Sequence, residues 1–208
     1  MTVRVEKVVT SGVFELDGGS WEVDNNVWLI GDDTEVLVVD APHDAAAIRS
    51  AIGDRDVVAI VLTHGHNDHL NAARELAESV SAQIWFPPED RMLWDAVHAA
   101  PPDHDLVDGT EFTVAGTTIR AIHTPGHSPG STCLYVEDLV VLFSGDTLFN
   151  GGPGATGRSY SSFETIIDSI REKLLVLPPE TVVHTGHGDD TRIGDESPHL
   201  DEWITRGH

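Results

Sequence analysis

The sequence predicts an α/β (α+β) fold, with strands and helices layered in one domain over residues 1–208. Short apolar runs rich in β-branched residues recur along the chain, and each ends in a loop, as buried strands do. Stretches with apolar residues at helical spacing follow several of these runs. This combination is typical of strands and helices that share one hydrophobic core. The pattern leaves open whether the strands form one sheet or two.

The expected strands are short and apolar. They cover residues 36–39, 57–62, 83–86, 118–122, 131–136, 139–143 and 181–183. The run 131–136 contains Cys133, the only cysteine, which we expect to be buried as a small apolar side chain. A single cysteine excludes an internal disulfide bond.

The expected helices are fewer. Residues 44–52 and 70–80 have helical spacing, and residues 163–177 form an apolar stripe that ends at Pro178. A last short helix is expected over residues 197–206. Residues 87–108 are rich in proline and aspartate and have no regular pattern.

Composition and charge narrow the classes of partner. Hydrophobic residues make up 40% of the chain and charged residues 23%, which is typical of a soluble globular protein. The net charge of −23 disfavours nucleic acid and anionic membranes, because both bind basic patches. No apolar stretch is long enough to span a bilayer, and the N-terminus lacks the apolar core of a secretion signal. We therefore expect a cytoplasmic protein, a monomer or homodimer, with a small-molecule substrate.

Residues 63–69 (THGHNDH) are the most informative segment. They place three imidazoles and a carboxylate directly after an expected strand. Other imidazoles and carboxylates also follow apolar runs, and strand ends bring distant residues to one point. The imidazoles are His64, His66, His69, His127 and His187, and the two carboxylates that we expect to be ligands are Asp68 and Asp146. These groups are too many for one tetrahedral zinc ion, but they suit two ions that share a bridging carboxylate.

The motifs resemble those of the metallo-β-lactamase-fold hydrolases. The resemblance rests on Asp40 and on residues 63–69, 124–131 (TPGHSPGS), 144–149 (SGDTLF) and 185–188 (TGHG), in the order of that family. It extends from about residue 20 to about residue 195. It implies a four-layer αββα sandwich with a metal site at one edge, between the two sheets.

The resemblance also implies a role for each candidate. The first ion would take His64, His66 and His127, and the second ion would take Asp68, His69 and His187. Asp146 would bridge the two ions, and Asp40 would orient a ligand through a hydrogen bond. The implied cofactors are two divalent ions, zinc foremost, with iron or manganese as alternatives. A hydroxide shared by the ions would attack an acyl carbon, with its geometry held by Asp68 and Asp146.

Asp146 favours one group within this family. The β-lactamases of this fold place cysteine or serine there, whereas the aspartate and the following Gly157-Arg158 resemble glyoxalase II. That group hydrolyses thioesters, so we expect an acyl conjugate of a small thiol such as glutathione, mycothiol or bacillithiol as substrate. We expect the basic C-terminal extension that grips glutathione in glyoxalase II to be largely missing. A different thiol or acyl group would then bind.

Other functions remain open. A persulfide dioxygenase of this fold uses one iron held by two histidines and an aspartate, and lactonase-type hydrolases share the fold. A metal-binding module without activity is disfavoured, because no candidate ligand is missing from either metal position.

Three further features are left with alternatives. Arg158 is expected either to bind a substrate carboxylate or to form a structural salt bridge. Residues 87–108, together with Trp85, are expected either to form a wall of the substrate pocket or to pack onto the sandwich. His43 is close enough to Asp40 to reach the rim of the site, but we do not count it as a ligand.

Overall fold

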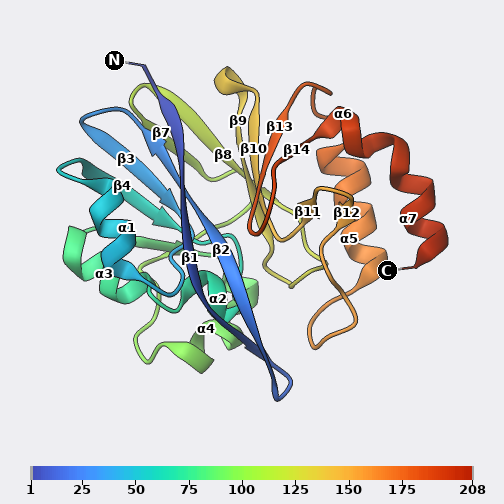
Figure 1. Ribbon diagram of the computed structural model, residues 1–208, viewed down its shortest axis with the longest axis horizontal. Coiled ribbons are helices and arrows are strands. Elements are labelled where there is room, and N and C mark those ends of the chain that lie inside the picture. The colour runs from blue at the N-terminus through green and yellow to red at the C-terminus, as the bar shows by residue number, and fades with distance from the viewer. Residues whose placement is uncertain (1, 208) are drawn as a thin grey trace.

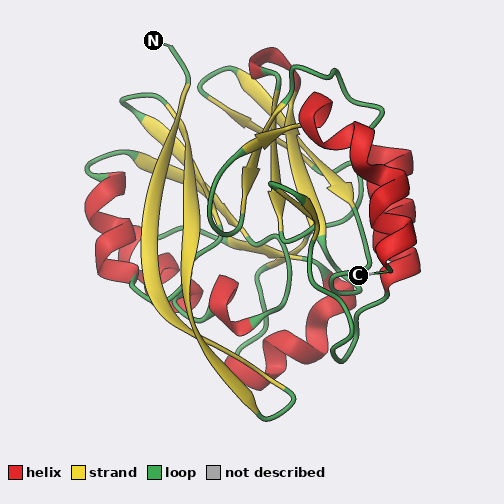
Figure 2. Cartoon of the chain, turned by 45° about the vertical axis from the view of Figure 1, so that its right-hand side comes forward, coloured by secondary structure: helices red, strands yellow, loops and turns green. Residues whose placement is uncertain are grey.

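The computed structural model describes residues 2–207, which form four layers (Figure 1). Two six-stranded sheets pack face to face, and helices cover their outer sides. Figure 2 shows the same layers after a turn, with the C-terminal helices together on one side. This αββα arrangement confirms the predicted fold class and shows that the strands form two main sheets.

The first sheet begins with a long hairpin. Its strand order is β1-β2-β3-β4-β5-β6. The bounds are β1 Arg4–Leu16, β2 Gly19–Gly31, β3 Glu35–Val39, β4 Asp56–Val61, β5 Ile84–Phe86 and β6 His104–Asp105. The hairpin of β1 and β2 is antiparallel, whereas β3 to β6 run parallel to one another. The closed end of this hairpin projects beyond the other strands of the sheet (Figure 1).

The second sheet has the order β14-β13-β10-β9-β8-β7. Its bounds are β7 Glu111–Val114, β8 Thr117–His123, β9 Thr132–Val136, β10 Val141–Gly145, β13 Val182–Thr185 and β14 Thr191–Arg192. A separate small ribbon pairs β11 Leu148–Phe149 with β12 Gly152–Pro153. Strands β10 and β13 are parallel, so their C-terminal ends lie at the same edge of the sheet.

The helices divide between the two outer faces. Helices α1 and α3 lie on one side of the molecule, and α5 and α7 lie on the other (Figure 1). The bounds are α1 Ala45–Ile52, α2 Asn67–Leu70, α3 Ala73–Val80, α4 Arg91–Val97, α5 Phe163–Ser169, α6 Ile193–Glu196 and α7 Leu200–Arg206. Asp44 caps α1, because its carboxylate accepts a hydrogen bond from the backbone of Ala47. No helix among residues 2–207 is long and apolar enough to cross a membrane.

Two expected helices are divided. The expected helix over residues 70–80 is part of α2 followed by α3, and the expected helix over residues 163–177 is α5 followed by a π-helical turn, Ile170–Leu174. Residues 87–108 are more regular than expected. They contain the 3₁₀ turn Pro88–Asp90, α4 and β6.

Alternation along the strands builds three apolar layers. In β2, Trp28 and Ile30 face the second sheet, whereas Val27 and Leu29 face the helices of the first sheet. A third layer packs α5 and α7 onto the outer face of the second sheet. Since successive strand residues point to opposite faces, one apolar run serves two layers.

Candidate metal centre

Loops at the ends of strands from both sheets bring all seven ligand candidates into one cluster. The segment after β4 supplies His64 and His66, and α2 supplies Asp68 and His69. His127 lies between β8 and β9, Asp146 follows β10, and His187 follows β13. The candidates come from distant parts of the sequence, as expected for groups held at one edge of the sandwich.

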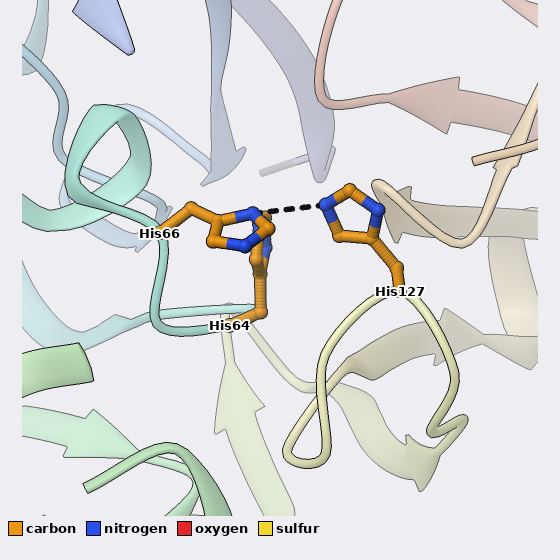
Figure 3. A group of neighbouring side chains, drawn as sticks. All are labelled: His64, His66 and His127. Carbon is orange, nitrogen blue, oxygen red and sulfur yellow. Dashed lines mark hydrogen bonds between the residues drawn. The ribbon is translucent and has the colours of Figure 1, made fainter. Parts of the chain in front are cut away.

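The first triad consists of three imidazoles. His66 Nδ1 lies 3.1 Å from His64 Nε2 and 3.0 Å from His127 Nε2. Figure 3 shows the rings of His66 and His127 facing each other from two different loops, with His64 beside them. Nitrogens that bind one zinc ion at about 2.0–2.1 Å lie roughly 3.3 Å apart, so this spacing fits one ion.

The second triad combines two imidazoles with a carboxylate. His187 Nε2 lies 3.2 Å from His69 Nε2 and 3.4 Å from Asp68 Oδ2, and His69 Nε2 lies 3.8 Å from Asp68 Oδ2. Asp68 and His69 are buried, and His187 is half-buried. This mixture of nitrogen and oxygen donors suits zinc, iron or manganese.

Asp146 lies between the two triads. Its Oδ2 is 3.5 Å from His127 Nε2 in the first triad and 3.4 Å from His187 Nε2 in the second. Its Oδ1 is 3.3 Å from His69 Nε2 but is buried without a well-directed hydrogen bond. A buried carboxylate oxygen that lacks a donor is the chemistry expected of a metal ligand.

The outer nitrogens of four rings show which atoms carry protons. His127 Nδ1 faces the carbonyl of Ala155 at 2.8 Å, and His187 Nδ1 faces the carbonyl of Asp24 at 2.7 Å. His69 Nδ1 faces Asp40 Oδ2 at 2.9 Å. Because carbonyls and carboxylates only accept, each Nδ1 donates its proton there.

His64 follows the same rule. Thr63 Oγ1 donates its proton to Asp40 Oδ2 at 2.9 Å, so it accepts a hydrogen bond from His64 Nδ1 at 3.0 Å. With the outer nitrogens donating to these partners, His64, His69, His127 and His187 all direct their Nε2 atoms toward the centre, where each lone pair would be available to a cation. Such converging lone pairs repel one another unless a cation lies among them, so the residues present fit divalent metal ions.

The electrostatics differ between the two triads. Burial lowers the pKa of His66 to about 3 and that of His64 well below its ordinary value. Burial also opposes protonation of His187, but the charge of Asp146 outweighs it and raises the pKa of His187 to about 10. Burial acts to raise the pKa of Asp68, yet the charge of His69 and the hydrogen bond from His187 lower it to about 2. Protons therefore bind the imidazole of His187 in the second triad far more readily than those of His64 and His66 in the first.

Asp40 joins the motif at residues 63–69 to the strand before it. Its Oδ1 accepts the backbone N–H of Thr63 at 2.7 Å, while its Oδ2 accepts from both Thr63 and His69. Asp40 has a φ of 61°, a conformation that aspartate adopts more readily than most residues. The contact with His69 fixes the orientation of that ring.

Gly186 shows why glycine precedes His187. A Cβ atom at Gly186 would lie 2.2 Å from Asp146 Oδ1. Any side chain there would displace the carboxylate that lies between the two triads.

Asp90 was not predicted from the sequence as part of the site. This fully buried carboxylate accepts hydrogen bonds from the backbone of Gly65 at 2.7 Å and of Gly130 at 2.6 Å, and from Ser128 Oγ at 2.6 Å. It therefore ties the loop of His64 and His66 to the loop of His127. No sequence signal distinguished it from the other aspartates of residues 87–108.

Asn25, which was not predicted as part of the site, forms a second group with His43, which was considered only for the rim of the site. Asn25 Nδ2 donates to Asp68 Oδ2 at 3.1 Å, and Asn25 Oδ1 lies 2.9 Å from His43 Nε2. Asn71 fixes His43 in turn, because it accepts the backbone N–H of His43 and donates to its Nδ1. This chain of bonds directs the amide of Asn25 toward Asp68. The available sequence signal was the pair Asn25-Asn26 directly before the apolar run of residues 27–30.

A cavity of about 300 Å³ opens onto the cluster. Its floor includes His66, His127, Asp68, Asp146 and His187, and its apolar walls include Phe14, Trp21, Val23 and Phe149. Arg158 lies at this cavity, with its guanidinium 3.8 Å from the centre of the Trp21 ring. This position leaves its donors able to meet a substrate.

The segment 87–108 does not line this cavity. Trp94 is fully buried against Phe86, and Met92 is exposed on the outer surface. This position favours packing onto the sandwich, although Leu93, Ala96 and Val97 line a separate small pocket beside His66. The wall comes instead from the β1–β2 hairpin, whose contribution to the cavity the sequence pattern did not indicate.

Comparison with known proteins agrees with the geometry of the site. The sequence profile described as "Metallo-beta-lactamase superfamily" matches residues 21–187. The chain belongs to the metallo-β-lactamase superfamily. In this superfamily, a fold with such histidine and aspartate groups implies divalent metal ions and a metal-dependent hydrolase.

Two curated relatives are similar along most of their length. The chain is 35% identical to the "Probable metallo-hydrolase YqgX" of Bacillus subtilis, over 85% of this chain and 92% of that protein. It is 33% identical to the "Hydroxyacylglutathione hydrolase GloC" of Haemophilus influenzae, over 82% of this chain and 89% of that protein.

Two solved structures also resemble the chain. The "BLEG-1 B3 metallo-beta-lactamase" has a TM-score of 0.79 and 30% identity, covering 92% of this chain and 98% of that one. The structure of "TTHA1623 in a di-iron-bound form" has a TM-score of 0.75 and 28% identity, covering 84% of this chain and 93% of that one.

Proposed function

We propose that this superfamily member is a binuclear metal-dependent hydrolase that cleaves thioesters, the acyl conjugates of a small thiol such as glutathione, mycothiol or bacillithiol. The observation that carries the proposal is the position of Asp146 between two triads of donors, beside a cavity large enough for a small molecule. The similarity to the hydroxyacylglutathione hydrolase GloC supports thioesters as the substrate class.

The ligand set that we propose follows the two triads. His64, His66 and His127 would hold the first ion, Asp68, His69 and His187 would hold the second, and Asp146 would contact both. We propose zinc at both positions, with iron or manganese as alternatives, since imidazole and carboxylate suit all of them. The di-iron form of the similar TTHA1623 keeps iron among the alternatives.

The bound ions would supply an activated water and polarise the acyl carbonyl. The residues of the chain do the rest. Asp68 and Asp146 line the cavity and can accept hydrogen bonds from the attacking water, which orients it toward the acyl carbon. Asp40, through His69, keeps one ring in place during the reaction.

The chemistry of the leaving group favours a thioester as the substrate. A thiol with a pKa near 8.5 leaves as a thiolate without a general acid, whereas an amine requires a proton. Among the described residues that line the cavity, Arg158 is the one arginine, and no lysine is present. We propose that it binds a carboxylate of the thiol carrier, since its planar fork matches that group.

Metal analysis and a substrate panel test the proposal together. Protein purified without chelator should contain two ions per chain and release free thiol from at least one acyl conjugate of glutathione, mycothiol or bacillithiol. Chelation should abolish the release, and added metal should restore it. A fully loaded protein that cleaves none of these conjugates would show that the thioester assignment is wrong.

The same panel should include competing substrates. A β-lactam tests the likeness to the BLEG-1 structure, and a lactone tests the lactonase alternative. A thiol persulfide with oxygen tests the dioxygenase alternative, for which one iron per chain and oxygen consumption are the expected signs. Faster turnover of any of these than of every thioester would replace the proposed function.

A further inference from the structure

The amide side chain of Asn67 binds the edge of the β1–β2 hairpin. Asn67 Oδ1 accepts a hydrogen bond from the backbone N–H of Glu15 at 2.9 Å, and Asn67 Nδ2 donates one to the carbonyl of Val13 at 2.8 Å. A backbone N–H only donates and a carbonyl only accepts, so these partners fix which way the amide faces. Asn67 thus pairs with β1 as a neighbouring strand would.

This contact occupies a free edge of the first sheet. Within residues 2–207, β1 has β2 as its one strand neighbour, which leaves the backbone groups of its other edge without a strand partner. Asn67 stands between His66 and Asp68 in the sequence, and both are candidate ligands. One short segment therefore supplies ligands and also holds the hairpin.

The contact sets the position of two aromatic rings. Phe14 lies between the two backbone groups that Asn67 binds, and its ring centre is 5.0 Å from that of His66. Trp21 is the cross-strand partner of Phe14, with ring centres 5.6 Å apart. Both rings line the cavity, so they form an apolar wall beside the candidate ligands.

The closed end of the hairpin is fastened on its other side as well. Asp17 Oδ2 accepts a hydrogen bond from the backbone of Ser159 at 3.0 Å, and the guanidinium of Arg158 stacks on Trp21. These attachments on both sides hold the aromatic wall formed by Phe14 and Trp21 in place beside the candidate ligands. A wall that is already in place selects substrates by their shape.

We propose that Asn67 is a positioning residue for substrate selection, which holds Phe14 and Trp21 so that the enzyme prefers acyl groups with an apolar chain or ring over acetyl. The inference rests on the proposed thioester hydrolysis, since it places the acyl carbon beside the metal ligands. An apolar acyl group at that point loses contact with water against Phe14 and Trp21. Acetyl is too small to bury much of this wall.

Hydrogen exchange tests the attachment without any substrate. Asn67→Ala should speed exchange of the Glu15 amide by about tenfold, the factor for the loss of one ordinary hydrogen bond. Ser11→Ala is the matched control, because it removes the 2.6 Å bond from Ser11 Oγ to Asp24 on the same hairpin and leaves Asn67 in place. Unchanged exchange at Glu15 in Asn67→Ala would overturn the attachment.

Selectivity tests the consequence. The ratio of kcat/KM for a hexanoyl over an acetyl thioester of one thiol should be about tenfold or more in the unaltered protein, as an apolar pocket distinguishes methylene groups. Asn67→Ala and Phe14→Ala should bring this ratio toward one at unchanged metal content, whereas Ser11→Ala should keep it. A ratio unaffected by Asn67→Ala, with Glu15 exchange accelerated, would overturn the role in selection.

Product binding separates this inference from the proposed function. Calorimetry with hexanoate and acetate on the metal-loaded protein compares the same two acyl sizes without turnover. A protein that cleaves no thioester but binds hexanoate more tightly, with the difference lost in Asn67→Ala, would refute the proposed function and support the role of Asn67. Equal binding of the two anions by the unaltered protein would overturn the selection by Phe14 and Trp21.

Discussion

The buried carboxylate of Asp90 accepts a 2.7 Å hydrogen bond from the backbone N–H of Gly65, the residue between His64 and His66. It also accepts from Ser128 and Gly130, which follow His127. One side chain thus sets the separation of the two loops that supply the first triad. Substitution of residues that hold metal ligands in place typically lowers metal affinity by about 10–100-fold.

Asp90→Asn should destabilise the fold and weaken the first metal position. The single oxygen of asparagine can accept either from Gly65 and Ser128 or from Gly130. In both orientations the amide NH₂ group then faces at least one backbone N–H, and two donors cannot form a hydrogen bond. One unsatisfied buried donor costs about 1–3 kcal/mol of unfolding free energy. Denaturant unfolding measures the loss, and metal titration against a chelator measures the affinity.

Asp95→Asn serves as the control for this change. Asp95 is an exposed aspartate of α4 that pairs with Arg91 on the surface, and such pairs contribute about 0–1 kcal/mol. If Asp90→Asn were no more destabilising than Asp95→Asn, Asp90 would not hold the two loops.

The candidate ligands could be recognised from the sequence, whereas the role of Asp90 could not. His64, His66, Asp68 and His69 form a dense cluster next to an apolar strand, and their residue types name the chemistry directly. The importance of Asp90 depends on partners 25 and 40 residues away in sequence, which only the packed fold brings together. In the sequence alone, a buried aspartate in a polar stretch cannot be distinguished from an aspartate at the surface.

The hairpin wall was missed for a related reason. Asp17-Gly18 is a turn dipeptide typical of tight hairpins, and both residues have positive φ, 53° and 77°. The local signal for the hairpin was thus present. Its reach over the cavity depends on the hydrogen bonds of Asn67 and Asp17 to the rest of the fold, which no local pattern encodes.

The two metal positions should empty in a fixed order as pH falls. Protons and metal ions compete for the same nitrogen lone pairs, so metal affinity falls with pH. Burial lowers the pKa of His66 to about 3, so protons compete weakly at the first triad. Burial opposes protonation of His187 too, but Asp146 raises its pKa to about 10, so protons compete strongly at the second triad.

Equilibrium dialysis from about pH 8 to about pH 5, at constant free metal, should therefore remove the second ion before the first. Elemental analysis should give a plateau near one ion per chain at intermediate pH. Loss of both ions in one step would contradict the difference in electrostatics between the triads. His187→Ala removes a donor of the second triad only. This variant should therefore already contain about one ion per chain at about pH 8.

Asp40→Asn should weaken the second ion more than the first. The substitution keeps the shape of the side chain but replaces an acceptor of Thr63 or His69 with an NH₂ group, so the His69 ring loses its anchor. Loss of such an anchor lowers metal affinity by about 10–100-fold. Chelator competition measures the two affinities separately.

Asp44→Asn provides the control for Asp40→Asn. Asp44 caps α1 a few residues further along, and asparagine is as good a cap as aspartate, so stability and metal affinity should stay unchanged. An equal loss at both metal positions in Asp40→Asn would point to general disruption of the motif, and not to the orientation of His69.

Asp146→Ala should lower the occupancy of both metal positions, whereas Asp68→Ala should lower only the second. Asp146 Oδ2 lies 3.5 Å from His127 and 3.4 Å from His187, so its removal takes a carboxylate from each triad. Asp68 Oδ2 lies within 3.8 Å of His69 and His187, both in the second triad. Elemental analysis of each purified variant gives ions per chain. Retention of one full ion by Asp146→Ala would mean that this carboxylate serves a single metal and bridges nothing.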